Sequence, residues 1–332
     1  MPTIRKNTMK RITAKKAIAT VALICATALF TACSSGSGSA AGPVATPAAS
    51  ATPGSFAAPG DNDLGGKSHP VKIGIMSPEV EYDYLKDAAQ AEGIYLDYTN
   101  FNDYNQPNPA VADGELDLNQ FQHILYLANY NIESGQPLVA LQSTAIYPLS
   151  LYSHQYKSVG DIPQGAKITI PNDETNQARA LAVLAQNNLL KLKDGTDPLY
   201  ATPLDVDQAA SKVTVVPVSA EQTPRSLDDP GTAAAVINNT YALDANLDPT
   251  DAIAADDPNA AGSAPFVNIW AGKDGIQNDP VIQEILRLAR TQDWKDKLSE
   301  QSKGSAVIVD QDYAQLQQTL ADVENQLKAH QS

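Results

Sequence analysis

Residues 166–192, AKITIPNDETNQARALAVLAQNNLLKL, predict a strand that leads directly into a helix. The alternating β-branched run at Ala166–Ile170 stops at Pro171, which cannot donate to a sheet ladder. Beyond it, Ala, Leu and Val recur at helical spacing over Asn172–Leu192, and Asp173 is the candidate N-cap. A strand followed at once by a helix is the repeating unit of α/β proteins, so this stretch predicts that class.

The alternation of strands and helices continues on both sides of this stretch. Strands are predicted at Val71–Met76, Ile94–Phe101, Pro137–Leu141, Ile146–Ser153, Lys212–Ser219, Ala233–Ile237 and Phe266–Trp270. Helices are predicted around Glu79–Ala91 and Asp279–Arg290, and Pro109–Phe121 predicts a short helix, a turn at Gly114 and a short strand. This order predicts mostly parallel sheets. Because about 260 residues are many for one sheet, we expect two lobes.

The C-terminal residues 311–332 predict an amphipathic helix. Apolar side chains recur there at spacings of three and four, at Tyr313, Leu316, Leu320, Val323 and Leu327. We expect this helix to pack on the domain, and the alternative is a short self-associating helix.

The N-terminal residues predict a lipoprotein. Residues 1–32 join a basic opening without acids to the apolar run Ala17–Phe30, which is typical of a secretory signal and too short for a spanning helix. The small residues Thr31 and Ala32 precede Cys33, the candidate lipidation residue. An ordinary secreted protein is the alternative. Residues 33–70 are rich in Ser, Gly, Ala and Pro and predict a flexible tether.

Composition excludes several classes of function. The formal net charge of −15 argues against nucleic acid as a partner, because phosphates would be repelled. No cysteine follows Cys33, so the mature chain has no disulfide and no cysteine-based metal site. No nucleophile elbow, zincin motif, P-loop or dinucleotide-binding fingerprint occurs, and the four histidines lack metal-ligand spacing. We therefore predict no catalytic residue, no metal and no cofactor.

Four polar side chains are candidates for ligand binding. Asn176 and Arg179 lie three residues apart, on one face of the predicted helix and near its positive end. The planar guanidinium group of Arg179 can donate two parallel hydrogen bonds to the carboxylate of a ligand. The spacing does not distinguish that role from a structural salt bridge. Asn238 follows one predicted strand and Asn268 lies in another, where α/β proteins form ligand crevices. For these two the alternative is an asparagine satisfied by the backbone.

The segment NQFQHILYL, residues 119–127, concentrates ring-bearing side chains. Phe121, His123 and Tyr126, together with Tyr104, could line a pocket, although composition alone favours the core. No second metal ligand and no nucleophile motif accompanies His123.

The chain resembles the NlpA/MetQ-type methionine-binding lipoproteins of bacterial ABC importers. The resemblance rests on stretches that occur in family order: NFNDYNQPN (100–108), DGELDLNQFQH (113–123), YLANYN (126–131), IPNDETNQARAL (170–181), LLKLKDG (189–195), QTPRSLDD (222–229), AVINNTYAL (235–243) and PFVNIW (265–270). The turn IMSPEVE lacks the usual glycine, and the tail beyond Asp310 has no counterpart in the usual pattern.

The resemblance implies a two-lobed periplasmic-binding-protein-like fold with crossover strands and a ligand cleft between the lobes. It places lobe 1 at about 71–146 plus 265–310, and lobe 2 at about 147–264. It also implies ligand-binding roles, with Arg179 holding a carboxylate, for Tyr104, Phe121, His123, Tyr126, Asn176, Arg179, Asn238 and Asn268.

The implied function is capture of methionine by a lipid-anchored protein on the extracytoplasmic side of the cell membrane, carrying lipid such as palmitate on Cys33. The implied partners are an ABC permease and its ATPase. One alternative keeps this class and changes the ligand to a methionine-containing dipeptide, D-methionine or another apolar amino acid. Two others change the class: a cell-envelope enzyme with His123 as general base, and a surface interaction protein that uses the C-terminal helix.

Overall fold

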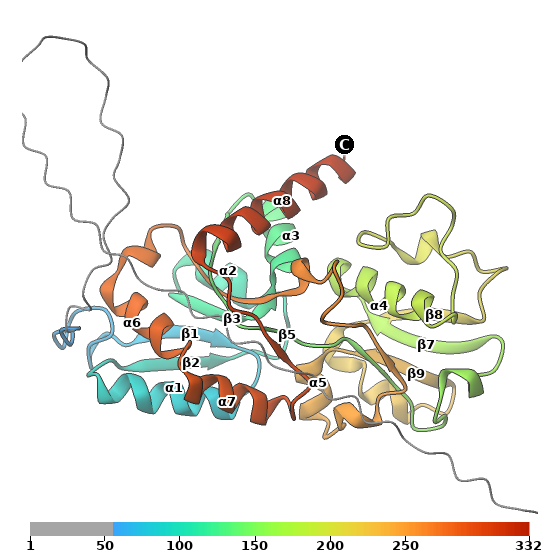
Figure 1. Cartoon of the computed structure of the whole chain (residues 1–332), viewed down its shortest axis with the longest axis horizontal. Helices are drawn as coiled ribbons and strands as arrows, with labels where there is room; N and C mark the ends of the chain where they lie inside the picture. Colours follow the sequence, from blue (N-terminus) through green and yellow to red (C-terminus); the bar gives the residue numbers. More distant parts are fainter. Residues whose placement is uncertain (1–55, 332) are drawn as a thin grey trace, which may run out of the picture. The chain divides into compact units, whose positions relative to one another are not determined.

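The computed structural model describes residues 56–331 (Figure 1). These residues lie in one compact unit, Gly54–Ser332. The predicted signal peptide (1–32), Cys33 and the first part of the predicted tether, up to residue 55, lie outside the described residues. Within residues 56–331, no helix combines the length and apolar character needed to cross a bilayer.

One five-stranded sheet is mixed. Its order is β2-β1-β3-β11-β4, with bounds β1 Val71–Ile75, β2 Leu96–Asn100, β3 Leu118–His123, β4 Val139–Ser143 and β11 Asn268–Gly272. The first three strands along the chain run parallel, whereas β11 runs antiparallel to both of its neighbours. The expectation of mostly parallel sheets therefore fails at this strand, because it returns from the second sheet against the direction of β3.

Helices cover the first sheet through two apolar clusters. One cluster joins the sheet to α1 Val80–Ala91, α6 Pro280–Leu288 and α7 Gln292–Gln301. The other joins it to α2 Pro107–Asp113, α3 Ile124–Ser134 and α8 Tyr313–Gln331. Figure 1 shows α1 beside α7, and the two helices are in contact.

The second sheet contains the stretch with which the sequence analysis began. Its order is β10-β6-β9-β7-β8, with bounds β6 Ser150–Tyr152, β7 Ala166–Pro171, β8 Val213–Val218, β9 Thr232–Ile237 and β10 Ala254–Ala255. β7 pairs in parallel with both neighbours and leads directly into α4 Glu174–Gln186. β6 pairs antiparallel with β9 and β10, so the expectation of mostly parallel sheets fails in this sheet as well. A short helix, α5 Asn239–Asp244, follows β9.

The beginning of α4 confirms the predicted cap, and its end corrects the predicted length. The Asp173 carboxylate accepts a hydrogen bond from the Asn176 backbone N–H at 3.0 Å, as an N-cap does. The helix ends at Gln186, not at Leu192, because Asn188 takes a left-handed conformation with φ +57°. Asparagine tolerates that conformation and so ends the helix.

The chain passes from the first sheet to the second and back again. The outward passage contains β5 Ala145–Ile146, which pairs antiparallel with β12 Val307–Ile308. The return passage lies between β10 and β11. Each sheet has its own apolar clusters, so the predicted two-lobed α/β fold is confirmed.

Residues 56–70, which composition predicts to be tether, belong instead to the folded unit. Phe56 and Leu64 pack against the core of the first sheet. The Tyr95 backbone N–H donates to the Gly65 carbonyl at 2.8 Å, and that of Gly65 donates to the His69 carbonyl at 2.8 Å. Gly65 has φ +82°. In composition alone, a glycine that fixes a tight turn looks the same as a glycine in a linker.

Helix α8 packs on the domain. Leu316, Leu320, Val323 and Leu327 are all buried and join the cluster that contains α3. Figure 1 shows the two helices side by side. Near the C-terminus the His330 ring stacks on Tyr200, with ring centroids 4.6 Å apart. The domain itself therefore covers the apolar side chains that a self-associating helix would have to expose.

We predict that Leu316→Ala lowers the free energy of unfolding by about 2–5 kcal/mol, because the side chain is fully buried and its removal leaves a cavity. Urea denaturation followed by circular dichroism measures the change. Asn325→Ala, on the exposed side of the same helix, is the control and should stay within about 0.5 kcal/mol of the parent. Equal effects of the two substitutions would contradict the packing of α8.

Candidate functional site

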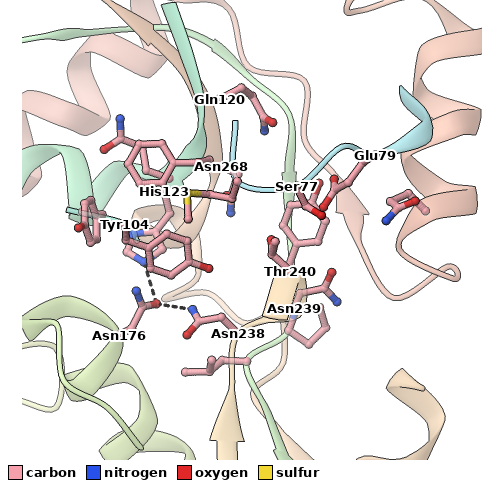
Figure 2. A pocket seen from close by; sticks show the side chains of 18 of the residues that line it. Ser77, Glu79, Tyr104, Gln120, His123, Asn176, Asn238, Asn239, Thr240 and Asn268 are labelled. Carbon is pink, nitrogen blue, oxygen red and sulfur yellow. Dashed lines mark hydrogen bonds between the residues drawn. The ribbon is translucent and has the colours of Figure 1, made fainter. Parts of the chain in front are cut away.

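A cavity between the two sheets collects side chains from both of them. It is lined by all eight residues that the sequence analysis singled out: Tyr104, Phe121, His123, Tyr126, Asn176, Arg179, Asn238 and Asn268. Figure 2 shows the side chains converging from strands and helices of the two lobes. Residues that lie far apart in the sequence therefore line the same cavity.

One end of the cavity is aromatic. The rings of Tyr104, Phe121 and Tyr126 lie 5.7–6.2 Å apart between centroids, in tilted and edge-to-face arrangements. Tyr104 also packs 5.0 Å from Tyr241 in the second lobe. Such geometry is favourable for aromatic pairs. The trio is at once part of a buried cluster and part of the cavity wall, so the two interpretations offered by the sequence are both realised.

His123 is held in one neutral tautomer. It is the last residue of β3 and the N-cap of α3, and its Nδ1 accepts a hydrogen bond from the Tyr126 backbone N–H at 3.1 Å. The proton of the neutral ring must then reside on Nε2, which lies 3.4 Å from Asn176 Oδ1. Burial, with the nearby Arg179 guanidinium, lowers the pKa of His123 to about 3.

An amide network joins the helix start to the strand end. Asn176 Nδ2 donates to Asp173 Oδ1 at 2.8 Å, and Asn176 Oδ1 accepts from Asn238 Nδ2 at 2.9 Å. This leaves Asn238 Oδ1 buried without a hydrogen-bond partner in the described part of the chain. A buried hydrogen-bond acceptor without a donor lowers the stability of the fold, and a ligand that donates to it removes this cost. Asn268 Nδ2 donates to the Phe266 carbonyl at 3.4 Å.

Arg179 combines the two roles that the sequence left open. Its Nε donates to Asp256 Oδ2 at 2.6 Å and its Nη2 to the Tyr147 carbonyl at 2.8 Å, so the structural salt bridge exists. The guanidinium carbon lies 4.4 Å from the centroid of the Phe266 ring. Within residues 56–331 no hydrogen bond involves Nη1, and because the side chain lines the cavity, Nη1 can donate to an anion there.

The other end of the cavity contains residues that the sequence analysis did not select. Ser77 and Glu79 lie there, across from Tyr104 and His123 (Figure 2), and Tyr147 and Gln301 are further lining residues of the cavity that were not selected. Burial raises the pKa of Glu79, and the neighbouring carboxyl groups of Glu81 and Asp244 raise it further. The departure of IMSPEVE from the family pattern pointed to this turn, but nothing in the sequence pointed to Tyr147 or Gln301.

The arrangement suits a small zwitterion better than a metal. Within residues 56–331, no group of three or more His, Cys, Asp or Glu side chains could hold a metal ion. The cavity instead offers an apolar aromatic wall, the positively charged guanidinium group of Arg179 and neutral amide dipoles. Such a set can bind an apolar side chain that carries a charged end.

Comparison with known proteins agrees with this geometry. The family model described as NlpA lipoprotein matches residues 71–309 and ends just before α8. The D-methionine-binding lipoprotein MetQ of Escherichia coli is 33% identical over 241 residues, covering 71% of this chain and 87% of that protein. Outer membrane lipoprotein 3 of Mannheimia haemolytica is 34% identical over 246 residues, covering 73% and 90%.

Solved structures show the same fold. The substrate-binding protein of a methionine transporter from Streptococcus pneumoniae has a TM-score of 0.68 and 35% identity, covering 72% of this chain and 95% of that one. A nutrient-binding protein from Burkholderia cenocepacia bound to methionine has a TM-score of 0.66 and 36% identity, covering 72% and 99%. From the fold, the matched residues and these relatives together, the chain belongs to the NlpA lipoprotein family.

Proposed function

We propose that this protein is a lipid-anchored solute-binding protein that captures methionine and delivers it to an ABC transporter. The observation that carries the proposal is a single cavity in which an aromatic wall faces a buried arginine and an unsatisfied asparagine oxygen. Relatives named as methionine-binding lipoproteins and methionine-transporter components support it. The protein is a binding protein and not an enzyme.

The cavity accounts for each part of the ligand. A thioether is polarisable and packs well against aromatic edges and faces, so the methionine side chain enters among Tyr104, Phe121 and Tyr126. The carboxylate accepts hydrogen bonds from Arg179 Nη1. Asn238 Oδ1 is the acceptor that an ammonium group satisfies. Enclosure by residues of two lobes implies a hinge motion for entry and release.

Asp256 preorganises the arginine. Its Oδ2 accepts from Arg179 Nε, while its Oδ1 accepts from the Leu149 backbone N–H at 2.8 Å. The guanidinium is thereby fixed before the ligand arrives, which reduces the entropy lost on binding. The pairing also compensates a buried positive charge that would otherwise be costly.

The anchor and the location are part of the same proposal. Lipid on Cys33 would hold the protein at the extracytoplasmic face of the cell membrane, next to the permease that receives the ligand. The partners are then the permease and its ATPase. Mass spectrometry of the N-terminal peptide tests the anchor, because an unmodified Cys33 in the membrane fraction would contradict it.

Another ligand of the same class remains the nearest alternative, namely D-methionine, a methionine-containing dipeptide or another apolar amino acid. Mass spectrometry of ligand retained through purification separates these from L-methionine.

The enzyme alternative assigns His123 the role of general base. The hydrogen bond from the Tyr126 backbone occupies Nδ1, so Nε2 carries the proton of the neutral ring. Neither ring nitrogen is then free to accept a proton from a substrate.

We predict that Arg179→Ala weakens L-methionine binding at least about 100-fold, which corresponds to roughly 2.7 kcal/mol. The carboxylate loses its charged donor, and calorimetric titration measures the loss. Arg179→Lys, which keeps the charge beside Asp256 but not the planar fork, should also weaken binding, with the fold checked by thermal denaturation. Arg225→Ala, an exposed arginine away from the cavity, is the matched control. Unchanged affinity in both Arg179 variants would contradict the assigned role.

We predict that His123 stays neutral between about pH 5 and 8, the range in which an ordinary histidine changes charge. Nitrogen NMR of labelled histidine should show a bare Nδ1 and a protonated Nε2 throughout that range, because the folded-state pKa is about 3. Below about pH 6.5 only the unfolded chain gains the proton at this position, so His123 lowers the free energy of unfolding as the solution is acidified. A His123 resonance that titrates near pH 6.5 would contradict this assignment.

A further inference from the structure

Three carboxyl groups gather at the end of the cavity away from the aromatic wall. Glu79 lines the cavity and is the N-cap residue of α1, and Glu81 lies in the first turn of that helix. Asp244 approaches from α5 in the second lobe, where it accepts a hydrogen bond from Ser77 Oγ at 2.7 Å. Figure 2 shows Glu79 and Ser77 across the pocket from Tyr104 and His123.

Glu79 and Glu81 ionise less readily than ordinary carboxyl groups. Burial raises the pKa of both carboxyl groups, and the neighbouring Glu81 raises that of Glu79 further. Glu81 is only 2% exposed, and its Oε2 has no hydrogen-bond partner among residues 56–331. Because two neighbouring ionised carboxylates repel each other, a proton on Glu79 is favoured in the free protein.

No positive side chain compensates this cluster. Among the described residues, the ion pairs of Lys, Arg and His involve other acids and none of these three. The other titratable groups packed against Glu79 are the phenols of Tyr82 and Tyr147, whose pKa values burial raises well above the ordinary range. The Tyr82 hydroxyl donates to Gln120. The surroundings of Glu79 thus supply carboxyl and phenol groups but no cation.

Arg179 and the carboxyl cluster differ in whether the protein itself supplies a counter-ion. The arginine is already paired with Asp256, so its positive charge is largely compensated before ligand binds. The Glu79 end is uncompensated, and within residues 56–331 no metal-binding group exists to neutralise it. The ligand proposed above is a zwitterion and brings one cation, its ammonium group.

We propose that Glu79 recognises the ammonium group of the ligand and that this group displaces the proton of the Glu79 carboxyl group. This rests on the proposed function, because it requires that the cavity is the ligand site. The ammonium group keeps its own protons, the Glu79 carboxyl becomes a carboxylate, and the displaced proton goes to solvent. Binding is therefore coupled to proton release, and an amine-free analogue loses both the contact and the coupling.

The sign of the pH dependence follows from this exchange. The ligand favours ionised Glu79, whose pKa burial and the neighbouring acids raise in the free protein. Affinity therefore increases with pH while free Glu79 is still protonated, by up to about tenfold per pH unit, and becomes constant above its pKa.

Calorimetric titration in buffers of different ionisation enthalpy measures the released proton directly. The probes are L-methionine, a dipeptide that ends in methionine, and N-acetyl-L-methionine, which has no ammonium group. We expect proton release with the first or the second probe and none with the third. The probe that releases the proton identifies which ammonium group, that of methionine itself or that of a preceding residue, reaches Glu79.

Glu79→Gln is the decisive variant, because it preserves shape and removes the titrating group. We expect it to abolish proton release and to lower the preference for an ammonium-bearing ligand over the acetylated one at least about tenfold. Asp83→Asn, an exposed acid on the same helix, is the matched control and should change neither. Thermal denaturation checks that both variants fold.

Two results would overturn the proposal. One is binding of methionine and of the dipeptide with proton release from neither in the parent protein between about pH 5 and 7, and the other is proton release that persists in Glu79→Gln. In either case methionine binding itself still stands, so these failures differ from failure of the proposed function, in which no probe binds.

Discussion

The hydrogen bonds of Asn176 hold the site together. This side chain lies at the start of α4, is fixed by the Asp173 cap, accepts from Asn238 at the end of β9, and faces His123 at the end of β3. Three strand–helix junctions, two from the second lobe and one from the first, therefore meet at one amide. Parallel strands bring such junctions to the same edge of a sheet, and this is why the cavity forms there.

Charge is distributed unequally along the cavity. Arg179 is paired with Asp256, whereas Glu79 and the carboxyl groups beside it have no counter-ion in the described chain. Neutral amides and a neutral histidine also line the cavity. A buried environment strengthens each of these interactions. A ligand must therefore offer an anion to Arg179 and a cation to Glu79 in order to bind. The aromatic wall then selects among zwitterions by the shape of the apolar side chain.

The sequence predicted the α/β class and the residues that meet in the cavity, because strand ends and helix starts carry local signals such as the Asp173 cap. The resemblance added the pairing of sites distant in sequence, including Tyr104 with Arg179. Other features depend on tertiary contacts. Helix α7 buries mainly Trp294 and Leu298 in a polar segment, and Gly65 forms a turn inside a linker-like composition. The acids around Glu79 acquire their character only through burial and through Asp244 from the other lobe.

The central claim is that one cavity holds methionine with its side chain among the rings and its carboxylate on Arg179. A crystal structure of the compact unit Gly54–Ser332 with L-selenomethionine tests it most directly, because selenium gives its own anomalous signal. The account predicts a selenium peak among Tyr104, Phe121 and Tyr126, with the carboxylate at Arg179 and the ammonium group towards Asn238 and Glu79. A peak elsewhere, or a ligand bound in the opposite orientation, would contradict the account.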